Sequence, residues 1–319
     1  MARIAIVTPA AAGARNGNRH TAARWAAMLR TAGHRVAVLR SWQGEPCDLL
    51  LALHARRSHD SIARYREAKP AEPLVVTLTG TDLYRDLPDS QEAHRSLDMA
   101  DRVIVLQEAA LRELSPAMRK KSGVVYQSSA TQLRNVAPAS PFRIAVIGHL
   151  REEKDPFRAA AALALIAGQE KEIQILHIGG ALEPSMAEQA RDWMAREPRY
   201  RWLGSLPHAR TLGWLARSHA LVHSSVMEGG ANVIVEAARI GTPVLASRVP
   251  GNIGMLGSKY PGYYPLYDHA SLARLVERLI ANPQFHEKLK EELKKRRTLF
   301  APAEERRSLL AVVRQALRP

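Results

Sequence analysis

The 319-residue chain contains a single cysteine, Cys47, so no disulfide can form within it. Aromatic residues make up only 5% of the chain, and no apolar run approaches the roughly 20 residues that a membrane-spanning helix needs. The first residues, MARIAIVTPA, enter a strand pattern directly and do not resemble a signal peptide. These features exclude a disulfide-stapled module and an integral membrane protein, and we expect a cytoplasmic protein without stable membrane insertion.

Basic residues exceed acidic ones along the whole chain. The 46 Lys and Arg against 31 Asp and Glu give a formal net charge of +15, which favours phosphate-bearing partners, nucleic acids among them. However, 20 basic and 13 acidic residues lie in 1–138, and 26 and 18 lie in 139–319, so the surplus is not gathered in one tail. The run 288–297, KLKEELKKRR, is interpreted as a solvated helix face because glutamates interrupt the lysines. An even surplus is typical of an enzyme that handles phosphate groups, and we expect no nucleic-acid partner.

Short apolar runs alternate with longer amphipathic stretches, which is the pattern of parallel strands joined by crossover helices. The length favours two domains, and the segment 135–141, NVAPASP, interrupts the alternation with two prolines. We therefore predict an α/β protein with two doubly wound, Rossmann-like domains that face a cleft, residues 1–138 and 139–302. The remaining residues, 303–319, are predicted to form a helix that packs back on the first domain.

The predicted strands and helices locate the loops in which chemistry is expected. The predicted strands are 3–9, 35–40, 48–54, 73–80, 102–107, 123–127, 142–148, 173–179, 201–203, 220–224 and 243–247. The predicted helices are 18–32, 58–69, 89–100, 108–121, 156–168, 184–196, 208–217, 230–240 and about 303–317, and the chain after Tyr264 has a wholly helical pattern. Doubly wound domains bind ligands outside the carboxyl ends of their strands, so functional residues are expected in the loops that follow the strands.

Two of these loops combine glycine with polar residues. The first, AAAGARNGN at 10–18, contains Gly13 and Asn18, and its glycines let a phosphate approach the backbone at a helix start. Its spacing matches neither the dinucleotide fingerprint nor the Walker loop, and a plain turn explains it equally well.

The second, GHLREEKDP at 148–156, places Lys154 where a cation would stabilise a leaving diphosphate. For a lone lysine, a surface salt bridge with a neighbouring glutamate is the simpler interpretation.

The third loop carries two carboxylates. In SSVMEGGANVIVE, residues 224–236, Glu228 follows a predicted strand and Glu236 lies eight positions later, a little over two helical turns. A carboxylate can accept two hydroxyl hydrogen bonds, as sugar and ribose recognition require, while the backbone N–H groups of 229–231 can hold phosphate. In isolation, two such glutamates are most often solvent-exposed.

The second and third loops resemble the Gly-Arg-Leu…Lys loop and the paired-glutamate signature of retaining, GT4-like nucleotide-sugar glycosyltransferases of the GT-B fold. The resemblance implies a metal-independent enzyme with no cofactor and with a UDP-sugar as co-substrate. It implies that Lys154 and Glu228 are catalytic. The implied donor-binding residues are Gly13, Asn18, His149, Arg151, Gly204, Leu206, Gly229, Gly230, Ala231, Asn232 and Glu236. His149 departs from the family, which usually has arginine there, so either His149 or Arg151 would contact the phosphate.

Two further loops of the first domain follow predicted strands, LHARRSHD at 53–60 and LTGTDLYRD at 78–86. In the first of them, two adjacent arginines beside a histidine form a small cationic cluster suited to a compact oxyanion. Pairing of the arginines with Asp60 and Asp82 is an equally supported interpretation. The loops resemble those of the selenosugar synthases of selenoneine biosynthesis. That resemblance implies selenophosphate and a UDP-sugar, of the N-acetylglucosamine or glucose type, as substrates, and a 1-seleno-sugar, UDP and phosphate as products. It implies a catalytic His54 and an acceptor site formed by Arg56, Arg57, Thr79, Gly80, Thr81 and Asp82.

Three alternative functions follow from the same features. A glycosyltransferase acting on a cell-envelope or membrane-surface acceptor would use the +15 charge as an electrostatic anchor. A nucleic-acid-binding protein is supported by the charge alone and would bind in a salt-dependent manner. A non-hydrolysing sugar-nucleotide epimerase would share the fold and need no acceptor.

Overall fold

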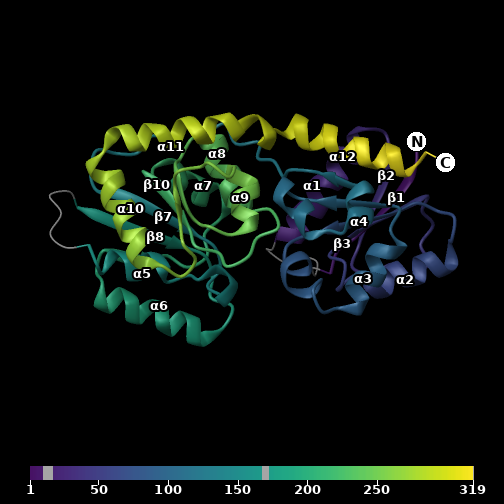
Figure 1. Cartoon of the computed structure of the whole chain (residues 1–319), viewed down its shortest axis with the longest axis horizontal. Helices are drawn as coiled ribbons and strands as arrows, with labels where there is room; N and C mark the ends of the chain where they lie inside the picture. The colour runs from purple at the N-terminus through teal and green to yellow at the C-terminus, as the bar shows by residue number, and fades with distance from the viewer. Residues whose placement is uncertain (10–16, 167–171, 319) are drawn as a thin grey trace. The chain divides into compact units, whose positions relative to one another are not determined.

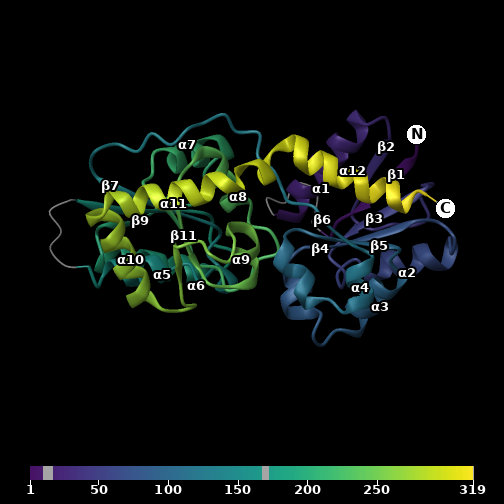
Figure 2. The same ribbon diagram turned by 45° about the horizontal axis from the view of Figure 1, so that its top comes forward.

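The structure, a computed structural model, describes residues 1–9, 17–166 and 172–318. It divides into two compact units, drawn in Figures 1 and 2. The first contains Met1–Ser128, Glu228–Asn232 and Ala301–Pro319, and the second contains Ser129–Met227 and Val233–Phe300. Each unit has a six-stranded sheet with parallel pairing and helices around it, so the predicted α/β class is confirmed. Glu228–Asn232 belong to the first unit by their contacts, whereas the sequence analysis assigns them to the second domain.

The first unit has the strand order β2-β1-β3-β4-β5-β6. Its strands are β1 (Arg3–Val7), β2 (Arg35–Leu39), β3 (Leu49–Leu53), β4 (Leu74–Leu78), β5 (Arg102–Val105) and β6 (Ser122–Val124). Its helices are α1 (Gly17–Thr31), α2 (His59–Ala68), α3 (Gln91–Met99), α4 (Pro116–Lys120) and α12 (Pro302–Ala316), with short turns η1 (Asp82–Asp86) and η2 (Glu108–Glu113). The strand order reverses at β1 and β3, so the loops after these two strands are where a ligand site is expected.

Alternate residues of the central strands pack into two different layers, because successive side chains of a strand point to opposite faces. Ile4 and Ile6 belong to the layer formed with α1 and α12, which includes Trp25, Leu309 and Val313. The intervening residues of β1 face the layer formed with α2 and α3. The last helix thus covers one face of the first sheet beside α1, and both faces of the sheet are buried.

The second unit has the strand order β12-β11-β10-β7-β8-β9. Its strands are β7 (Phe142–Ile147), β8 (Ile173–Ile178), β9 (Tyr200–Trp202), β10 (Ala220–His223), β11 (Val244–Ser247) and β12 (Tyr263–Tyr264). Its helices are α5 (Arg158–Leu163), α6 (Pro184–Arg196), α7 (His208–Ala216), α8 (Asn232–Ile240), α9 (Pro250–Leu256), α10 (His269–Ala281) and α11 (Pro283–Arg296), with turns η3 (Glu152–Lys154) and η4 (Arg297–Phe300). Here the order reverses between β7 and β10, which are the strands preceding the second and third loops singled out above.

The structure differs from the predictions in four places. The single helix predicted at 108–121 is wrong: it is replaced by η2 and α4, because Ser115 caps a new helix whose first residue is Pro116. Helix α9 and strand β12 were not predicted, since α9 has seven residues and β12 has two, too few to show a period. The helix predicted at 156–168 is shorter, ending at Leu163.

Candidate functional site

The loops that follow β7 and β10 are joined by hydrogen bonds in the second unit. The Ser224 hydroxyl contacts the carbonyl oxygens of Lys154 and Asp155 at 3.0 and 2.8 Å, and the Val226 N–H donates to the Glu153 carbonyl at 2.9 Å. Asp155 has a left-handed backbone, with φ of 44°, and it ends the short turn η3. The structure therefore brings the second and third predicted loops together at the point where the strand order reverses.

Lys154 lies at this point. It lines a small cavity together with Gly148, Ser224 and Ser225, at the carboxyl ends of β7 and β10. Arg151 is more peripheral: 43% of its side chain is exposed, and its Nε lies 4.0 Å from a carboxylate oxygen of Glu153. Of these two cations, Lys154 has the position that charge stabilisation at the strand ends requires.

The imidazole of His149 is oriented by the loop that follows β8. The Gly180 N–H donates to Nδ1 of His149 at 3.2 Å, so a neutral His149 carries its proton on Nε2 and presents Nε2 as a donor. Gly179 allows this close approach: a Cβ there would lie 1.8 Å from the Gly148 carbonyl oxygen. The contact with Gly180 thus fixes the orientation of the His149 ring.

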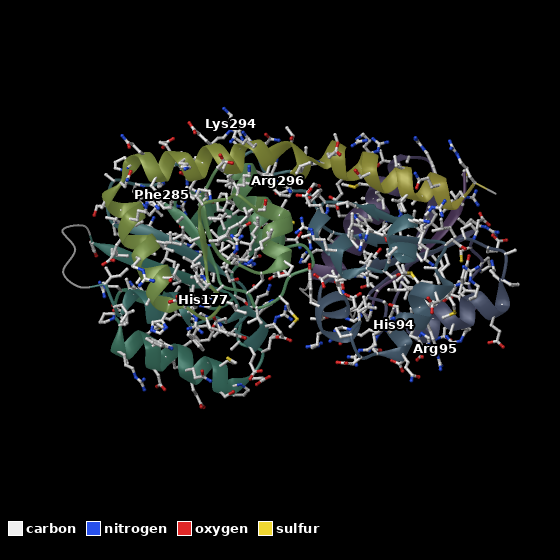
Figure 3. The ribbon with its side chains drawn as sticks, in the orientation of Figure 1. His94, Arg95, His177, Phe285, Lys294 and Arg296 are labelled. Atoms are coloured by element: carbon white, nitrogen blue, oxygen red, sulfur yellow. The ribbon has the colours of Figure 1, made fainter. Side chains whose placement is uncertain are left out.

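His177, labelled in Figure 3, contacts the start of the same loop and was not predicted as a site residue. It is buried in β8, with Nδ1 2.8 Å from the Tyr200 hydroxyl and Nε2 3.3 Å from the Gly148 carbonyl oxygen. Burial lowers the pKa of His177 to about 4, so it is neutral at pH 7. It is a positioning residue for the start of the His149–Lys154 loop, and only the sheet register reveals that role.

Glu236 is held by a residue that the sequence analysis also missed. Oε1 of Glu236 lies 2.7 Å from Nε2 of His208, at the start of α7. The carboxyl side chain is 14% exposed and the imidazole 68% exposed. The pKa of His208 is raised, chiefly by this hydrogen bond. His208 closely follows Gly204 and Leu206, which the resemblance implies to be donor-binding, and this nearness in the sequence is the signal by which it could have been found.

The segment Glu228–Asn232 lies against the turn after β4, within the first unit. A Cβ at Gly229 would lie 2.2 Å from the Thr79 carbonyl oxygen, and a Cβ at Gly80 would lie 2.8 Å from the Gly229 nitrogen. Gly80 has a φ of 138°, which disfavours any other residue. Two residues predicted for the acceptor thus contact a residue predicted for the donor, and both glycines are required for this approach.

The neighbours of Gly229 are also closely packed. Glu228 is 9% exposed and Ala231 is 3% exposed. A Cβ at Gly230 would lie 2.9 Å from Leu106 Cβ and 3.2 Å from the Gln127 side-chain oxygen. Asn232 begins α8, and its side-chain nitrogen would lie 3.9 Å from a Cβ at Gly17, next to Asn18 in the first turn of α1. Gly13 lies outside the described residues.

Asp82 organises the turn after β4. It is fully buried, and its carboxylate accepts hydrogen bonds from the backbone N–H groups of Thr79, Gly80 and Ala55 at 2.8, 2.9 and 2.9 Å. Backbone donors therefore occupy its oxygens. Within the described residues, the contacts of Asp82 are those of a positioning residue that joins the β3 and β4 loops.

His54 lies on the β3 loop with a left-handed backbone, φ 75°, and is 1% exposed. Its Nδ1 accepts from the Arg57 N–H at 3.2 Å, and its Nε2 is 3.0 Å from the Thr81 hydroxyl. The pKa of His54 is lowered, chiefly by burial and further by Arg57 and Arg56, against the raising effect of Asp82 and Asp86. His54 is held rigidly between the two predicted acceptor loops.

The two arginines beside His54 have different surroundings. Arg56 lies 3.0 Å from the Asp86 carboxylate, which also approaches Arg85 at 3.3 Å. Arg57 is exposed, and its guanidinium forms no ion pair with any residue that the structure describes. The pairing alternative in the sequence analysis named Asp60 and Asp82, whereas the structure pairs Arg56 with Asp86. Arg57 is therefore the cation available to an incoming anion.

Among the described residues, no group of three or more His, Cys, Asp and Glu side chains is arranged to hold a metal ion. No helix in the described ranges is long and apolar enough to cross a membrane.

A model of the family "Glycosyl transferases group 1" matches residues 130–296, slightly more than half of the chain. The chain belongs to this family. The matched range includes the loops after β7 and β10, with Lys154, Glu228 and Glu236. The glycosyltransferase part of the resemblance seen in the sequence is thus confirmed.

Relatives of this glycosyl transferase share limited identity with it. "Glycosyltransferase 1 domain-containing protein 1" of Xenopus tropicalis is 26% identical over 140 residues, 44% of this chain and 40% of that protein. The phosphatidylinositol N-acetylglucosaminyltransferase gpi3 subunit of Schizosaccharomyces pombe is 27% identical over 155 residues, 46% of this chain and 34% of that protein. The matched segments thus span well under half the length of these curated relatives.

The fold of the chain matches that of a solved protein over nearly the whole length of both. The structure of Anabaena Alr3699/HepE in complex with UDP matches with a TM-score of 0.81 and 17% identity, over 99% of this chain and 100% of that chain. The agreement establishes the two-unit GT-B architecture.

Proposed function

We propose that this glycosyl transferase transfers the hexosyl or N-acetylhexosaminyl group of a UDP-sugar to selenophosphate. In the first step, selenium forms a bond to the anomeric carbon while the bond from that carbon to the diphosphate oxygen breaks, and UDP leaves with the bonding electrons. Water then cleaves the phosphorus–selenium bond, which gives the 1-seleno-sugar and inorganic phosphate. Selenium is a soft nucleophile, so the first step needs no strong general base.

The donor half of the proposal is supported by the loops after β7 and β10. In this assignment, Glu236 accepts ribose hydroxyls, Glu228 accepts sugar hydroxyls, and Lys154 with the Nε2–H of His149 balances the negative charge that develops on UDP. The Glu236 side chain is 14% exposed and lies 2.7 Å from the exposed imidazole of His208, so its carboxylate can exchange this partner for ribose hydroxyls. The structural relative that contains UDP supports the choice of nucleotide.

One observation supports the proposed acceptor, selenophosphate. Arg57 offers an exposed guanidinium with no ion pair among the described residues, beside His54 and within the loop cluster that packs on Gly229. A guanidinium binds two phosphoryl oxygens at once, which leaves the selenium of selenophosphate free to attack carbon. Arg56 lies beside Arg57, and its Nε is 3.0 Å from the Asp86 carboxylate, so part of its positive charge is balanced by that carboxylate. The cluster suits a compact anion better than an extended apolar acceptor.

The experiment follows UDP release and product mass with UDP-N-acetylglucosamine or UDP-glucose, with and without selenophosphate. We expect release of UDP and phosphate and formation of the 1-seleno-sugar only when both substrates are present. Arg57→Ala should raise the apparent KM for selenophosphate about tenfold or more, as expected for loss of one charge-assisted contact, and leave the KM for the UDP-sugar nearly unchanged. Arg95→Ala removes an exposed cation from α3 of the same unit and serves as the matched control.

A second candidate is transfer to a membrane-surface acceptor, and the named phosphatidylinositol N-acetylglucosaminyltransferase subunit supports it. The same assay with phosphatidylinositol-containing vesicles in place of selenophosphate separates the two. Glycolipid formation with vesicles, and no seleno-sugar with selenophosphate, would replace the first proposal by the second.

A further inference from the structure

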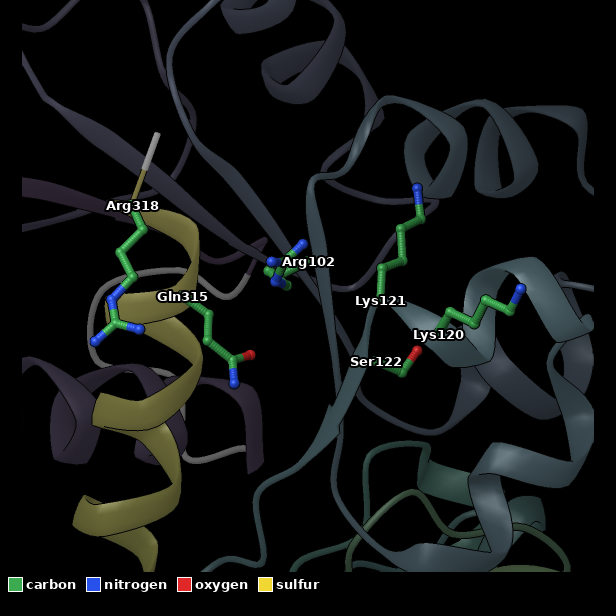
Figure 4. A pocket seen from close by; sticks show the side chains of 6 residues that line it. All are labelled: Arg102, Lys120, Lys121, Ser122, Gln315 and Arg318. Atoms are coloured by element: carbon green, nitrogen blue, oxygen red, sulfur yellow. The ribbon is translucent and has the colours of Figure 1, made fainter.

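A basic pocket lies at the amino ends of β5 and β6, away from the loops described so far. It has a volume of about 410 Å³ and is lined by Arg102, Lys120, Lys121, Ser122, Gln315 and Arg318. Figure 4 shows Gln315 of α12 and Arg318, two residues after the end of α12, on one side, Lys120, Lys121 and Ser122 on the other, and Arg102 between them. All six residues belong to the first unit. Because His54 and Thr79 follow the carboxyl ends of β3 and β4, the pocket lies at the opposite edge of the same sheet.

Two of the four cations are partly committed to the protein itself. The Lys121 ammonium donates to the carbonyl oxygens of Leu97 and Ala100 at 2.8 and 2.6 Å, at the end of α3. It therefore contributes its charge to the pocket but not a direct contact. Arg102 donates one N–H to the Asp101 carbonyl at 2.9 Å, and the rest of its planar donor group is left for a ligand.

The other two cations, Lys120 and Arg318, are exposed and form no ion pair with the described part of the chain. No acidic side chain lines the pocket. The nearest acid in sequence, Asp101, has its carboxylate engaged at 2.8 Å by both Arg66 and the Leu74 N–H. The positive charge of the pocket is therefore not neutralised from within.

The chemistry of the lining selects the ligand. The Ser122 hydroxyl already donates to the Met118 carbonyl at 2.7 Å, so the available donors are the guanidinium groups of Arg102 and Arg318, the Lys120 ammonium and the Gln315 amide. No aromatic side chain lines the pocket, so nothing there stacks on a nucleobase. Guanidinium groups bind phosphate oxygens in bidentate fashion, and the volume lies in the range of small-ligand sites.

We propose that this pocket binds the phosphate groups of a small, multiply charged anion, held mainly by Arg102 and Arg318. Soluble phosphate compounds and phospholipid headgroups share this chemistry. The site is distinct from the sugar-nucleotide site of the proposed function and does not depend on it.

The test uses pyrophosphate as the probe, titrated by calorimetry into the full chain with saturating UDP present, so that any UDP site is occupied. The variant is Arg102→Gln with Arg318→Gln. The matched control is Arg95→Gln with Lys294→Gln, which removes two exposed cations elsewhere (Figure 3). We expect the pocket variant to bind pyrophosphate at least tenfold more weakly than the wild type, and the control to stay within twofold.

A parallel measurement follows sedimentation with vesicles of phosphatidylglycerol and phosphatidylcholine, and with phosphatidylcholine vesicles alone. If the wild type and the control variant bind the anionic vesicles and the pocket variant does not, the pocket binds phosphate and a lipid headgroup supplies it. If the double variant folds poorly, both measurements are repeated with Arg318→Glu, which changes a single exposed residue. Equal pyrophosphate affinity and equal vesicle binding of the pocket and control variants would overturn the proposal.

Discussion

His208 Nε2 and Glu236 Oε1 are 2.7 Å apart, joining the start of α7 to α8. The hydrogen bond raises the pKa of the exposed imidazole above its ordinary value of 6.5. The contribution of this pair to stability is therefore complete below pH 6.5 and is lost as the pH rises through the raised pKa. In the proposed function Glu236 accepts ribose hydroxyls, so a nucleotide must compete with His208 for the same carboxylate.

We predict that UDP affinity rises with pH from about 6.5 upward and levels off above the raised pKa. Once ribose occupies Glu236, the pKa of His208 returns toward 6.5, so binding releases a proton and is favoured at higher pH. The rise should be about twofold to fivefold, since exposed ion pairs contribute about 0.5 to 1 kcal/mol. Calorimetry in buffers of different ionisation enthalpy measures the proton release directly.

His208→Gln keeps a hydrogen-bond donor without a titrating charge, so its UDP affinity should change less with pH than that of the wild type, the remaining change coming from the terminal phosphate of UDP, whose pKa is about 6. Glu236→Ala should weaken UDP binding at every pH. Unchanged UDP affinity in Glu236→Ala would contradict the ribose assignment, and a pH dependence in His208→Gln equal to that of the wild type would contradict the role of His208.

Lys154→Met is predicted to raise the activation free energy of the transfer step by about 2 to 4 kcal/mol. This is the usual effect of losing one preorganised charge beside a developing anion. The substitution keeps the length of the side chain and removes its charge. Single-turnover rates with the UDP-sugar measure the change. Arg151→Met, which removes a more exposed cation three residues away, should have a much smaller effect. Near-wild-type turnover of Lys154→Met would return this residue to a surface role.

Much of the fold was predictable because parallel strands buried on both faces consist of short Val, Ile and Leu runs. β3, LLLAL, and β7, FRIAVI, are clear in the sequence for that reason. β12 consists of Tyr263 and Tyr264 only, and two residues carry no period. The prediction of one helix over 108–121 is wrong because Ser115 and Pro116 start a new helix. From the sequence alone, a proline at the first position of a helix is hard to distinguish from a proline that interrupts a helical pattern.

Contacts that a loop motif marks are easier to locate from the sequence than contacts that a side chain makes across strands. Gly80 and Gly229 were named from loop motifs and a family resemblance, and in the structure the two loops approach each other closely at these glycines. His177 was missed, because its contact with the Gly148 carbonyl joins neighbouring strands 29 residues apart in sequence. Asp86 was missed for the same reason, since its pairing with Arg56 depends on how two loops meet.

Gly229→Ala is predicted to reduce activity about a hundredfold or more, since a 1 Å misplacement of reacting groups has an effect of that order. The added methyl would lie 2.2 Å from the Thr79 carbonyl oxygen, and the backbone of one segment must move. Gly213→Ala, in α7, is the matched control. Its methyl would approach only the ends of the Arg217 side chain, at 3.7 Å, and helix propensity favours alanine. Comparable activity losses in both variants would exclude a specific role for the Gly229 contact.

The last prediction concerns the anchoring of α12 to the first unit. Glu305 is fully buried, and its carboxylate contacts the Arg24 guanidinium at 2.8 Å, the Trp25 indole N–H at 2.7 Å and the Ser128 hydroxyl at 2.5 Å. Removing one member of such a pair leaves the partner charge uncompensated and costs about 3 to 5 kcal/mol. Glu305→Ala should therefore lower the urea concentration at which the first unit unfolds.

Glu304→Ala provides the control for this prediction, because Glu304 is the preceding residue and pairs only with groups on its own helix among the described residues, Arg307 and Ser308. Its loss should change stability by less than about 1 kcal/mol. Tryptophan fluorescence reports both units, because Trp193, Trp202 and Trp214 lie in the second unit, and circular dichroism follows the whole chain. Glu305→Gln retains an oxygen for the Trp25 N–H but not the negative charge that balances Arg24, so its stability should fall between that of the wild type and that of Glu305→Ala. Equal unfolding midpoints for Glu304→Ala and Glu305→Ala would show that the apolar contacts of α12 with the sheet, rather than this buried carboxylate, hold the helix in place.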